Sequence, residues 1–357
     1  MLTTIVSFIV VLGILIFFHE LGHFMVAKYV GVQVEEFAIG MGPKLISKQK
    51  GETLYSLRAL PLGGFCKMTG EMPIDEEADE EEIKLYEQAV EDERTLFQKS
   101  ILERFGVLSM GSIMNFVLGI LLFALIFMFF GVPTGQSDST VIGQVQPQSP
   151  AYEAGLRDHD QIIAIDGVEV DEWQEVQTKI HQSQEEELLL EVERDGAVLE
   201  YRVTPEYEER VDNAIIGIAP VFQRERINPI SALGRGIMQT VMLIFGILHA
   251  FGQMITGQMA AEVAGPVGIA SMIGDSARSG LLRLMEFTAL ISINLGVINL
   301  LPIPALDGGR LVFLLVEAVR GKPVDPEKEG LVHLVGMALL LLLMVVIVFF
   351  DIQRIFS

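Results

Sequence analysis

The chain has 357 residues, a net charge of −22 at pH 7 and a pI near 4.6, with half of its residues hydrophobic and a fifth charged. Such an acidic chain excludes nucleic acid as the expected partner, because the phosphate backbone is bound through clustered Lys and Arg. The single cysteine, Cys66, excludes a disulfide framework and a cysteine-rich zinc site. The apolar residues fall in long charge-free blocks, which predicts a membrane protein embedded in the lipid bilayer.

Four apolar blocks are each long enough to cross a bilayer, which takes about 20 residues at a rise of about 1.5 Å per residue. The first block has no basic n-region and no small-residue cleavage site, so we interpret it as a retained helix and not as a secretory signal. We therefore predict a polytopic α-helical membrane protein with four transmembrane helices, over residues 1–30, 105–130, 286–320 and 331–350.

The loop between the first two helices, residues 31–104, predicts a β-hairpin followed by an acidic loop. Val32–Ile39 and Thr53–Leu60 alternate apolar and polar residues, as half-buried strands do. Gly40-Met41-Gly42-Pro43 supplies a turn between these strands, and Leu62-Gly63-Gly64-Phe65 would close the hairpin.

Two further regions separate the second and third helices. Residues 137–222 contain short alternating runs and one helix over Asp171–Gln182, which predicts a small β-rich module. Residues 228–285 include Gly236–Ala261, a block without Asp, Glu, Lys or Arg whose polar side chains fall on one helix face. That pattern is typical of an amphipathic helix at the membrane interface.

Basic residues predict the orientation of the chain. Lys and Arg flank or fill residues 31–104 and 314–330, whereas none follows the second helix until Arg157. The positive-inside rule then places both loops in the cytoplasm, and both termini and residues 131–285 outside. Residues 71–93 hold twelve acids, which favours a solvated, flexible cytosolic segment over a docking site.

The run His19-Glu20-Leu21-Gly22-His23 lies inside the first apolar block. On a helix, positions i and i+4 lie one turn apart on one face, so His19 and His23 can bind one zinc ion together. Glu20 is rotated by about 100° from His19, which suits a general base acting on the water that zinc activates. Ionisable residues in a bilayer are costly and indicate function. A pair of histidines hydrogen-bonded to other helices is the alternative.

Asp307 is the remaining candidate for a third ligand inside the membrane. It lies where Pro302 and Pro304 break the third apolar block, and two glycines after it permit close backbone approach. Non-helical backbone at this depth is tolerated only when it is buried in protein or lines a wet cavity. A fifth crossing by Gly236–Ala261 would put Asp307 on the wrong side, so we expect that block at the outer surface or in a re-entrant position.

These two motifs, and the order of helix, cytosolic loop, helix, extracytoplasmic module and helix, resemble the site-2 protease family of intramembrane zinc metalloproteases. The resemblance is strongest to the bacterial regulator-of-sigma-E protease group. It implies that His19, His23 and Asp307 bind Zn²⁺ and that Glu20 is the catalytic base. It also implies a bacterial cytoplasmic membrane location, with the active site toward the cytosolic side.

The resemblance implies substrate contacts as well. Asn299 and Asn115 match family positions expected to contact substrate, with helix packing as the alternative for Asn299. The loop is similar to the family's membrane-associated β-hairpin, in which we expect Leu57, Gly63 and Gly64 to hold an extended substrate by strand addition. A purely structural hairpin is the alternative.

Two segments of the β-rich module, Ser149–Leu156 and Asp160–Val168, resemble a bacterial PDZ domain. We therefore expect a PDZ domain over residues 137–222. It could accept a peptide C-terminus by strand addition or act as a size filter, and we slightly favour the filter. Gly265-Pro266-Val267-Gly268-Ile269 is similar to a family segment that follows this domain.

We expect an intramembrane zinc endopeptidase that cuts single-span membrane proteins, such as anti-sigma factors or signal-peptide remnants already trimmed outside. A membrane adaptor with a structural metal site and a zinc transporter are the alternatives. Transport predicts further ionisable residues along a path through the membrane, whereas the helices otherwise offer only His333.

Overall fold

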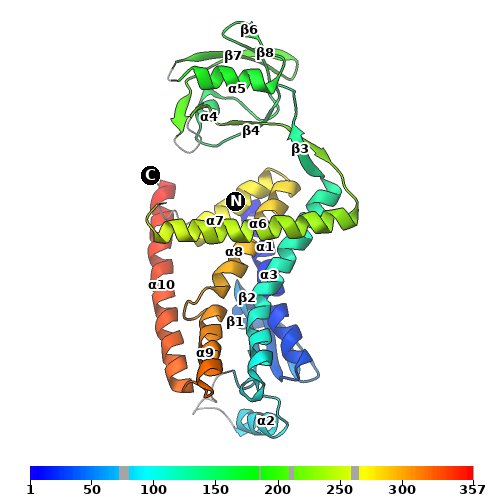
Figure 1. Cartoon of the computed structure of the whole chain (residues 1–357), viewed down its shortest axis with the longest axis vertical. Helices are drawn as coiled ribbons and strands as arrows, with labels where there is room; N and C mark the ends of the chain where they lie inside the picture. Colours follow the sequence, from blue (N-terminus) through cyan, green and yellow to red (C-terminus); the bar gives the residue numbers. More distant parts are fainter. Residues whose placement is uncertain (72–79, 185, 209–212, 259–264, 357) are drawn as a thin grey trace. The chain divides into compact units, whose positions relative to one another are not determined.

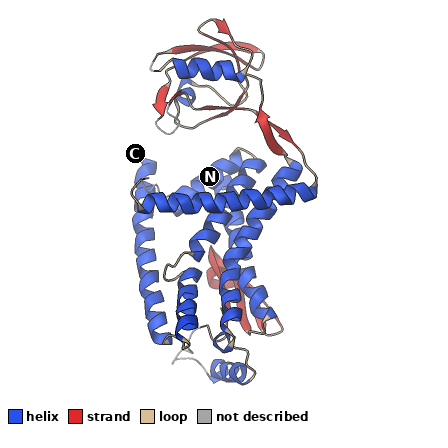
Figure 2. Cartoon of the chain, in the orientation of Figure 1, coloured by secondary structure: helices blue, strands red, loops and turns tan. Residues whose placement is uncertain are grey.

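The computed structural model describes residues 1–71, 80–184, 186–208, 213–258 and 265–356. The chain forms two compact units, Met1–Phe127 with Asn228–Ser357, and Met128–Ile227. The first unit is mainly helical and the second mainly β-structure, as Figure 1 and Figure 2 show.

Long apolar helices dominate the first unit. Five described helices are long and apolar enough to cross a membrane: α1 (Leu2–Tyr29), α3 (Ile101–Phe129), α6 (Pro229–Ile255), α8 (Leu281–Leu300) and α10 (Pro326–Phe356). The shorter helices are α2 (Glu80–Glu91), η1 (Leu96–Gln98), α7 (Pro266–Arg278) and α9 (Asp307–Arg320). The four predicted crossings overlap α1, α3, α8 with α9, and α10, whereas α6 is the helix that we expect at the interface.

α6 runs crosswise to the direction of α3 and α10 in Figure 1. The backbones of α6 and α3 are close at Gly236, where a Cβ atom would lie 2.8 Å from the Ile120 carbonyl oxygen. A helix that runs crosswise to the apolar helices is compatible with an interfacial position, although its length and composition would also allow a crossing. Its place relative to the membrane stays a prediction.

The third predicted crossing consists of two helices. α8 ends at Leu300 and α9 begins at Asp307, and the six residues between them form an irregular break. Pro302 and Pro304 lie in this break, as expected from residues that cannot continue a helix. Asp307 is therefore presented at a helix start.

The loop after α1 forms two antiparallel strands, β1 (Val34–Lys50) and β2 (Thr53–Met68), which extend well beyond the predicted Val32–Ile39 and Thr53–Leu60. The turn that joins them lies at residues 51–52, so the turn predicted at residues 40–43 is wrong. Gly40 and Gly42 have φ angles of +90° and +80°, and they shift the register inside β1 instead of ending it. Glycines with positive φ serve bulges as well as turns, and the local sequence does not distinguish the two.

The hairpin packs against α1 and α3. Phe37 of β1 lies opposite both Tyr55 and Cys66, so this part of β1 lies between two stretches of β2. A buried apolar cluster then joins the sheet to Ala27 of α1 and Val107 of α3. The cluster fixes β2 beside the helix that carries the two histidines.

The acidic segment predicted over residues 71–93 is described only in part, because residues 72–79 lie outside the described residues. Glu80–Glu91 form α2, and most of the described α2 side chains are exposed. This part of the acidic segment is therefore a solvated helix and not an irregular loop.

The second unit contains a four-stranded antiparallel sheet in the order β6-β5-β7-β8, formed by β5 (Gln161–Ile165), β6 (Val168–Glu169), β7 (Leu188–Arg194) and β8 (Ala197–Val203). The unit also contains three two-stranded antiparallel sheets. They are β3 (Val132–Gln136) with β12 (Phe222–Glu225), β4 (Ile142–Val145) with β11 (Ile218–Pro220), and β9 (Glu206–Glu208) with β10 (Asn213–Ile215). Its helices are α4 (Pro150–Ala154) and α5 (Trp173–Gln182), the second of which agrees with the predicted helix. Trp173 lies in the core of this unit with 2% of its surface exposed.

Candidate metal centre and active site

α1 presents His19 and His23 one turn apart on one face, as the spacing predicts. Their Nε2 atoms are 3.3 Å apart, and 13% and 8% of their side-chain surfaces are exposed. Nδ1 of His23 lies 2.8 Å from the Val107 carbonyl oxygen, which can only accept. Nδ1 of this imidazole therefore carries a proton, so in its neutral form the lone pair lies on Nε2, where it can bind a metal.

Two glycines allow α1 and α3 to come into contact at this level. A Cβ atom on Gly22 of α1 would lie 2.3 Å from the Met110 carbonyl oxygen. A Cβ atom on Gly111 of α3 would lie 2.2 Å from Nε2 of His23 and 2.8 Å from Cε1 of His19. Any side chain at either position would overlap its neighbours, so both glycines are needed for this packing.

Asp307 reaches the histidines because α9 begins directly against the break that precedes it. A Cβ atom on Gly308 would lie 2.1 Å from the Leu301 carbonyl oxygen, and one on Gly309 would lie 2.6 Å from that of Ile303. Both glycines therefore let the chain fold back tightly at the start of α9. The sequence predicts this close approach from the Asp-Gly-Gly run.

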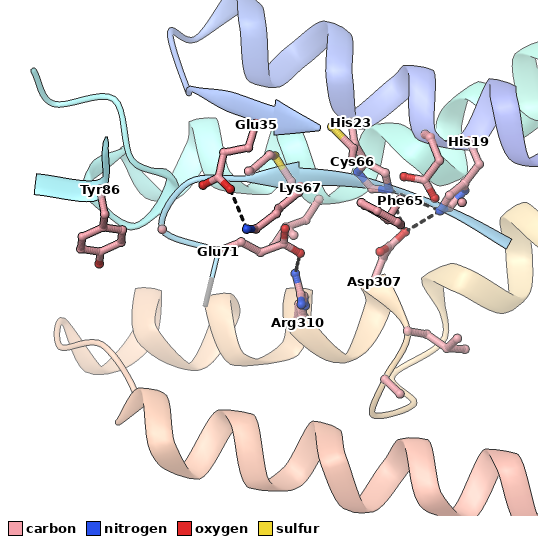
Figure 3. Close-up of a pocket in the computed structure, with 17 residues that line it drawn as sticks. His19, His23, Glu35, Phe65, Cys66, Lys67, Glu71, Tyr86, Asp307 and Arg310 are labelled. Atoms are coloured by element: carbon pink, nitrogen blue, oxygen red, sulfur yellow. Dashed lines mark hydrogen bonds and ion pairs between the residues drawn. The ribbon is translucent and has the colours of Figure 1, made fainter. Parts of the chain in front are cut away.

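The three side chains converge from α1 and α9, as Figure 3 shows. Oδ2 of Asp307 lies 3.3 Å from Nε2 of His19 and 3.4 Å from Nε2 of His23. Ligand atoms of a tetrahedral zinc site, with bonds of about 2.0–2.1 Å, lie about 3.3 Å apart. Oδ2 of Asp307 is also buried without a hydrogen-bond donor. This triangle of acceptor atoms fits a zinc ion.

Asn115 of α3 lies beside this triangle. It is fully buried, and its side-chain amide lies 3.2 Å from Nδ1 of His19. When Nε2 binds a metal, Nδ1 carries the proton and needs an acceptor. In the structure the amide nitrogen lies nearest Nδ1, and the amide oxygen is buried without a partner. Exchange of the amide N and O by a rotation of the side chain would bring this oxygen to Nδ1 as the acceptor. The residue predicted to contact substrate thus contacts a candidate ligand.

A cavity of about 590 Å³ opens at the three candidate ligands. Residues of α1, α2, α3, α9, β1, β2 and the break before α9 line it. Glu20 lines it, together with Gly64–Met68 of β2. Gly64 comes close to Glu20, because a Cβ atom there would lie 3.4 Å from Cγ of Glu20. The predicted base and a strand of the hairpin therefore face the same space as the metal site.

The sequence interpretation missed most of the residues that line this cavity, among them Arg310, Glu71 and Cys66, which carry ionisable groups. Arg310, one turn after Asp307 on α9, forms an ion pair with Glu71, and both line the cavity (Figure 3). Burial, together with the nearby carboxylates of Glu20 and Glu71, raises the pKa of the Cys66 thiol. Cys66 therefore stays protonated and is a poor metal ligand. The contact between Arg310 and Glu71 joins residues far apart in the sequence, and no local pattern predicts it.

The other residues predicted to bind substrate differ in position. Gly64 lines the cavity, whereas Gly63, Leu57 and Asn299 are not among the described residues that line it. Leu57 is 45% exposed and lies opposite Ile39 and Ile46 of β1. Asn299 is half-buried in the last turn of α8, just before the break. Substrate contact by these residues stays a prediction.

Apolar helices that enclose a His-Glu-x-x-His helix and a convergent carboxylate define a membrane-bound metallohydrolase. The model of the peptidase family M50 matches residues 7–343, and the chain belongs to this family. It is 38% identical to the zinc metalloprotease RasP of Geobacillus kaustophilus and 36% identical to the regulator of sigma-W protease RasP of Bacillus subtilis, over 99% of this chain and 99% of each relative. The probable protease eep of Enterococcus faecalis is 34% identical over 99% of both chains.

Among solved structures, the PDZ domain of the SdrC-like protein from Listeria monocytogenes overlaps 25% of this chain and 93% of its own length. The identity is 20% and the TM-score is 0.22.

The family confirms the resemblance to site-2 proteases, the enzyme class and the zinc cofactor. The chain is an integral membrane zinc metalloprotease, and the adaptor and transporter alternatives are set aside.

Proposed function

We propose that the chain is an intramembrane zinc endopeptidase that cuts single-span membrane proteins in regulated intramembrane proteolysis. The observation that carries the proposal is the convergence of His19, His23 and Asp307 in a cavity that Glu20 also lines. These groups come from two apolar segments, so a peptide bond cut here would lie within or at the edge of the bilayer.

In this mechanism Nε2 of His19, Nε2 of His23 and Oδ2 of Asp307 hold the metal. When bound, zinc supplies Lewis acidity to the scissile carbonyl and to the attacking water. Glu20 removes the proton from this water and later delivers it to the leaving amine. Val107 holds the imidazole of His23 and Asn115 holds that of His19, so that both Nε2 atoms face the proposed metal position.

We infer that the substrate binds as an extended strand beside β2. A helical peptide bond is shielded by its neighbours, so the segment to be cut must unwind before the water can attack. Residues 64–68 of β2 line the cavity next to Glu20, and a strand added there would bring its peptide bonds past the metal site. Of the three hairpin residues predicted to contact substrate, Gly64 is therefore the one that we propose lies against the substrate strand, together with its neighbours in β2.

We also propose the orientation that the basic residues predict, with the hairpin and the loop after α9 in the cytoplasm and residues 131–285 outside. α6 then lies at the outer interface of a bacterial cytoplasmic membrane, and four segments cross it. Residues 137–222 are proposed to form a PDZ domain that excludes substrates with large outer domains, so that prior trimming outside is required. Anti-sigma factors and signal-peptide remnants are the expected substrates, and the name of one relative, regulator of sigma-W protease, supports the first class.

The test compares membrane proteomes of cells that express the wild type, Glu20→Gln or Glu87→Gln, which changes an exposed acid of α2 and is the control. Single-span proteins should accumulate only with Glu20→Gln, while this purified variant keeps one zinc ion per chain. A chelator should inhibit the wild type, and added zinc should restore its activity. Unchanged processing by Glu20→Gln, or loss of its zinc, contradicts the role given to Glu20.

A further inference from the structure

Few of the α10 residues whose burial is described are buried against the rest of the protein. In its first turns Leu331, Leu334 and Val335 are 60%, 64% and 51% exposed, as expected for side chains that face lipid. Gly336 is buried, and His333 has 12% of its side-chain surface exposed. These two residues are three positions apart, so they share one face of the helix.

This face lies against the break between α8 and α9. The backbone N–H of Ala305 donates to Nδ1 of His333 over 2.9 Å. The imidazole also lies against Phe313 of α9, with ring centroids 5.6 Å apart. One turn further along α10, a Cβ atom on Gly336 would lie 2.3 Å from Cβ of Pro304 and 2.9 Å from its carbonyl oxygen. α10 therefore contacts two consecutive residues of the break.

The break has a particular need for this support. Ala305 adopts a φ angle of +76°, a left-handed conformation that disfavours a residue with a Cβ atom. Ala305 lies outside α8 and α9, so its N–H is not part of the hydrogen bonding of either helix. An unpaired N–H at membrane depth is costly. Nδ1 of His333 satisfies this N–H two residues before Asp307.

We propose that His333 is a positioning residue of the metal site, which fixes the carboxylate of Asp307 through the backbone of Ala305. The proposal rests on the proposed role of Asp307 as a zinc ligand. Among the described residues that line the cavity His333 is absent, so it acts through the break and not on the substrate. Because Nδ1 accepts, the imidazole carries its proton on Nε2, which faces the Glu329 carboxylate at 4.0 Å.

The geometry of this acceptor allows a sharp test. In a His333→Asn variant the side-chain oxygen occupies nearly the place of Nδ1, so it can accept from Ala305. In His333→Gln the oxygen falls nearer the place of Nε2 and misses this N–H. His333→Leu has no acceptor. Leu334→Ala changes the adjacent exposed residue and is the control.

Zinc affinity is measured on the purified full-length variants by competition with a chromogenic chelator, and the ligand geometry is followed in the visible spectra of the cobalt-loaded proteins. We expect His333→Leu and His333→Gln to lower the affinity by about tenfold or more, as loss of a group that orients a ligand does. His333→Asn should lie within about threefold of the wild type and keep its cobalt spectrum. Leu334→Ala should match the wild type.

Equal zinc affinity in the Asn and Gln variants, or wild-type affinity in the Leu variant, overturns the proposal. If His333→Leu does not accumulate in the membrane, the zinc affinities of His333→Asn and His333→Gln alone test the proposal, since both side chains are polar and similar in size. Asp307→Ala is measured in parallel. If Asp307→Ala keeps its zinc, the proposed ligand set fails; if it loses zinc while the Leu and Gln variants keep theirs, only the positioning role fails.

Discussion

Gly111 of α3 lies against His23 of α1 so closely that a Cβ atom on the glycine would be 2.2 Å from Nε2, the nitrogen that faces Asp307. We predict that Gly111→Ala displaces this imidazole and abolishes both zinc binding and proteolysis. Metal analysis of the purified protein and cleavage of a single-span reporter measure these effects.

Gly106, on the same helix, provides a matched control, because its Cβ atom would lie 3.6 Å from Cγ1 of Val26, an ordinary contact distance. Gly106→Ala should therefore keep zinc and activity, and alanine is also the better helix former. Stoichiometric zinc in Gly111→Ala would contradict the close contact between α3 and His23.

The second prediction concerns the amide of Asn115 beside His19. Asn115→Leu removes the acceptor for the Nδ1 proton, and we expect zinc affinity to fall by about 10- to 100-fold. Asn115→Asp keeps an acceptor, so it should bind zinc more tightly than Asn115→Leu. Chelator competition measures both. Equal zinc affinities in Asn115→Leu and Asn115→Asp would contradict the role of Asn115 as an acceptor for His19 and would indicate a packing role.

The third prediction is a pH dependence in the unit of residues 128–227. Asp160 accepts from Nε and Nη2 of Arg194 at 2.6 and 2.7 Å and from the Arg157 N–H at 2.8 Å. Burial acts to raise the pKa of Asp160, but these donors outweigh it and hold the pKa below the usual value of an aspartate. A carboxylate whose pKa is lower in the folded than in the unfolded protein stabilises the folded state fully at pH values above its pKa in the unfolded state. This stabilisation is lost as the pH falls through its pKa in the folded state.

Trp173 makes this loss measurable in the full chain, because it is the one tryptophan and lies in the core of the same unit. Its fluorescence should report acid unfolding of the wild type below about pH 4. Asp160→Asn should be less stable than the wild type at pH 7, and the difference should shrink as the pH falls. A difference that stays constant down to about pH 2, well below the unfolded pKa, contradicts the ion pair.

The fourth prediction concerns the Gly265-Pro266-Val267-Gly268 segment, which lies at the start of α7. Oδ1 and Oδ2 of Asp351 on α10 accept from the Gly265 and Gly268 N–H groups at 3.2 and 2.9 Å. A side chain from another helix thus serves as the N-cap of α7, and a Cβ atom on Gly265 would lie 2.5 Å from Oδ2.

Asp351→Ala leaves these N–H groups without the acceptor, which costs about 1 kcal/mol at a helix N-terminus. Hydrogen exchange of the full-length protein in lipid nanodiscs should then be several-fold faster in α7 and unchanged in α5. Asp351→Asn keeps one acceptor and should give an intermediate rate. Equal exchange rates in α7 of the wild type and Asp351→Ala would contradict the capping role.

Much of the candidate site could be predicted because its geometry is local. His19, Glu20 and His23 lie within one turn and a half of a single helix, whose period fixes how they project. Asp307 stands out because prolines and glycines interrupt an apolar block there, and a carboxylate at membrane depth needs a cation or a proton to offset its burial.

The contacts that support the ligands could not be predicted, because they depend on how separate helices pack; the sequence predicts that Asn115 contacts substrate, not a ligand. Asn115 contacts His19, and His333 contacts Ala305, across large separations in the sequence. The prediction of the hairpin turn was wrong for a different reason. Gly40 and Gly42 are typical turn residues, yet β1 continues through them and they lie at irregularities in its pairing with β2.

The candidate ligands come from opposite ends of the chain, two from α1 and one from the start of α9. During synthesis the ribosome delivers α1 first, so the histidine pair enters the bilayer long before the aspartate has been translated. A nascent chain therefore passes through nearly its whole translation without a complete set of metal-binding groups. With the proposed ligand set, the order of the polypeptide delays proteolytic competence until the late helices have been inserted.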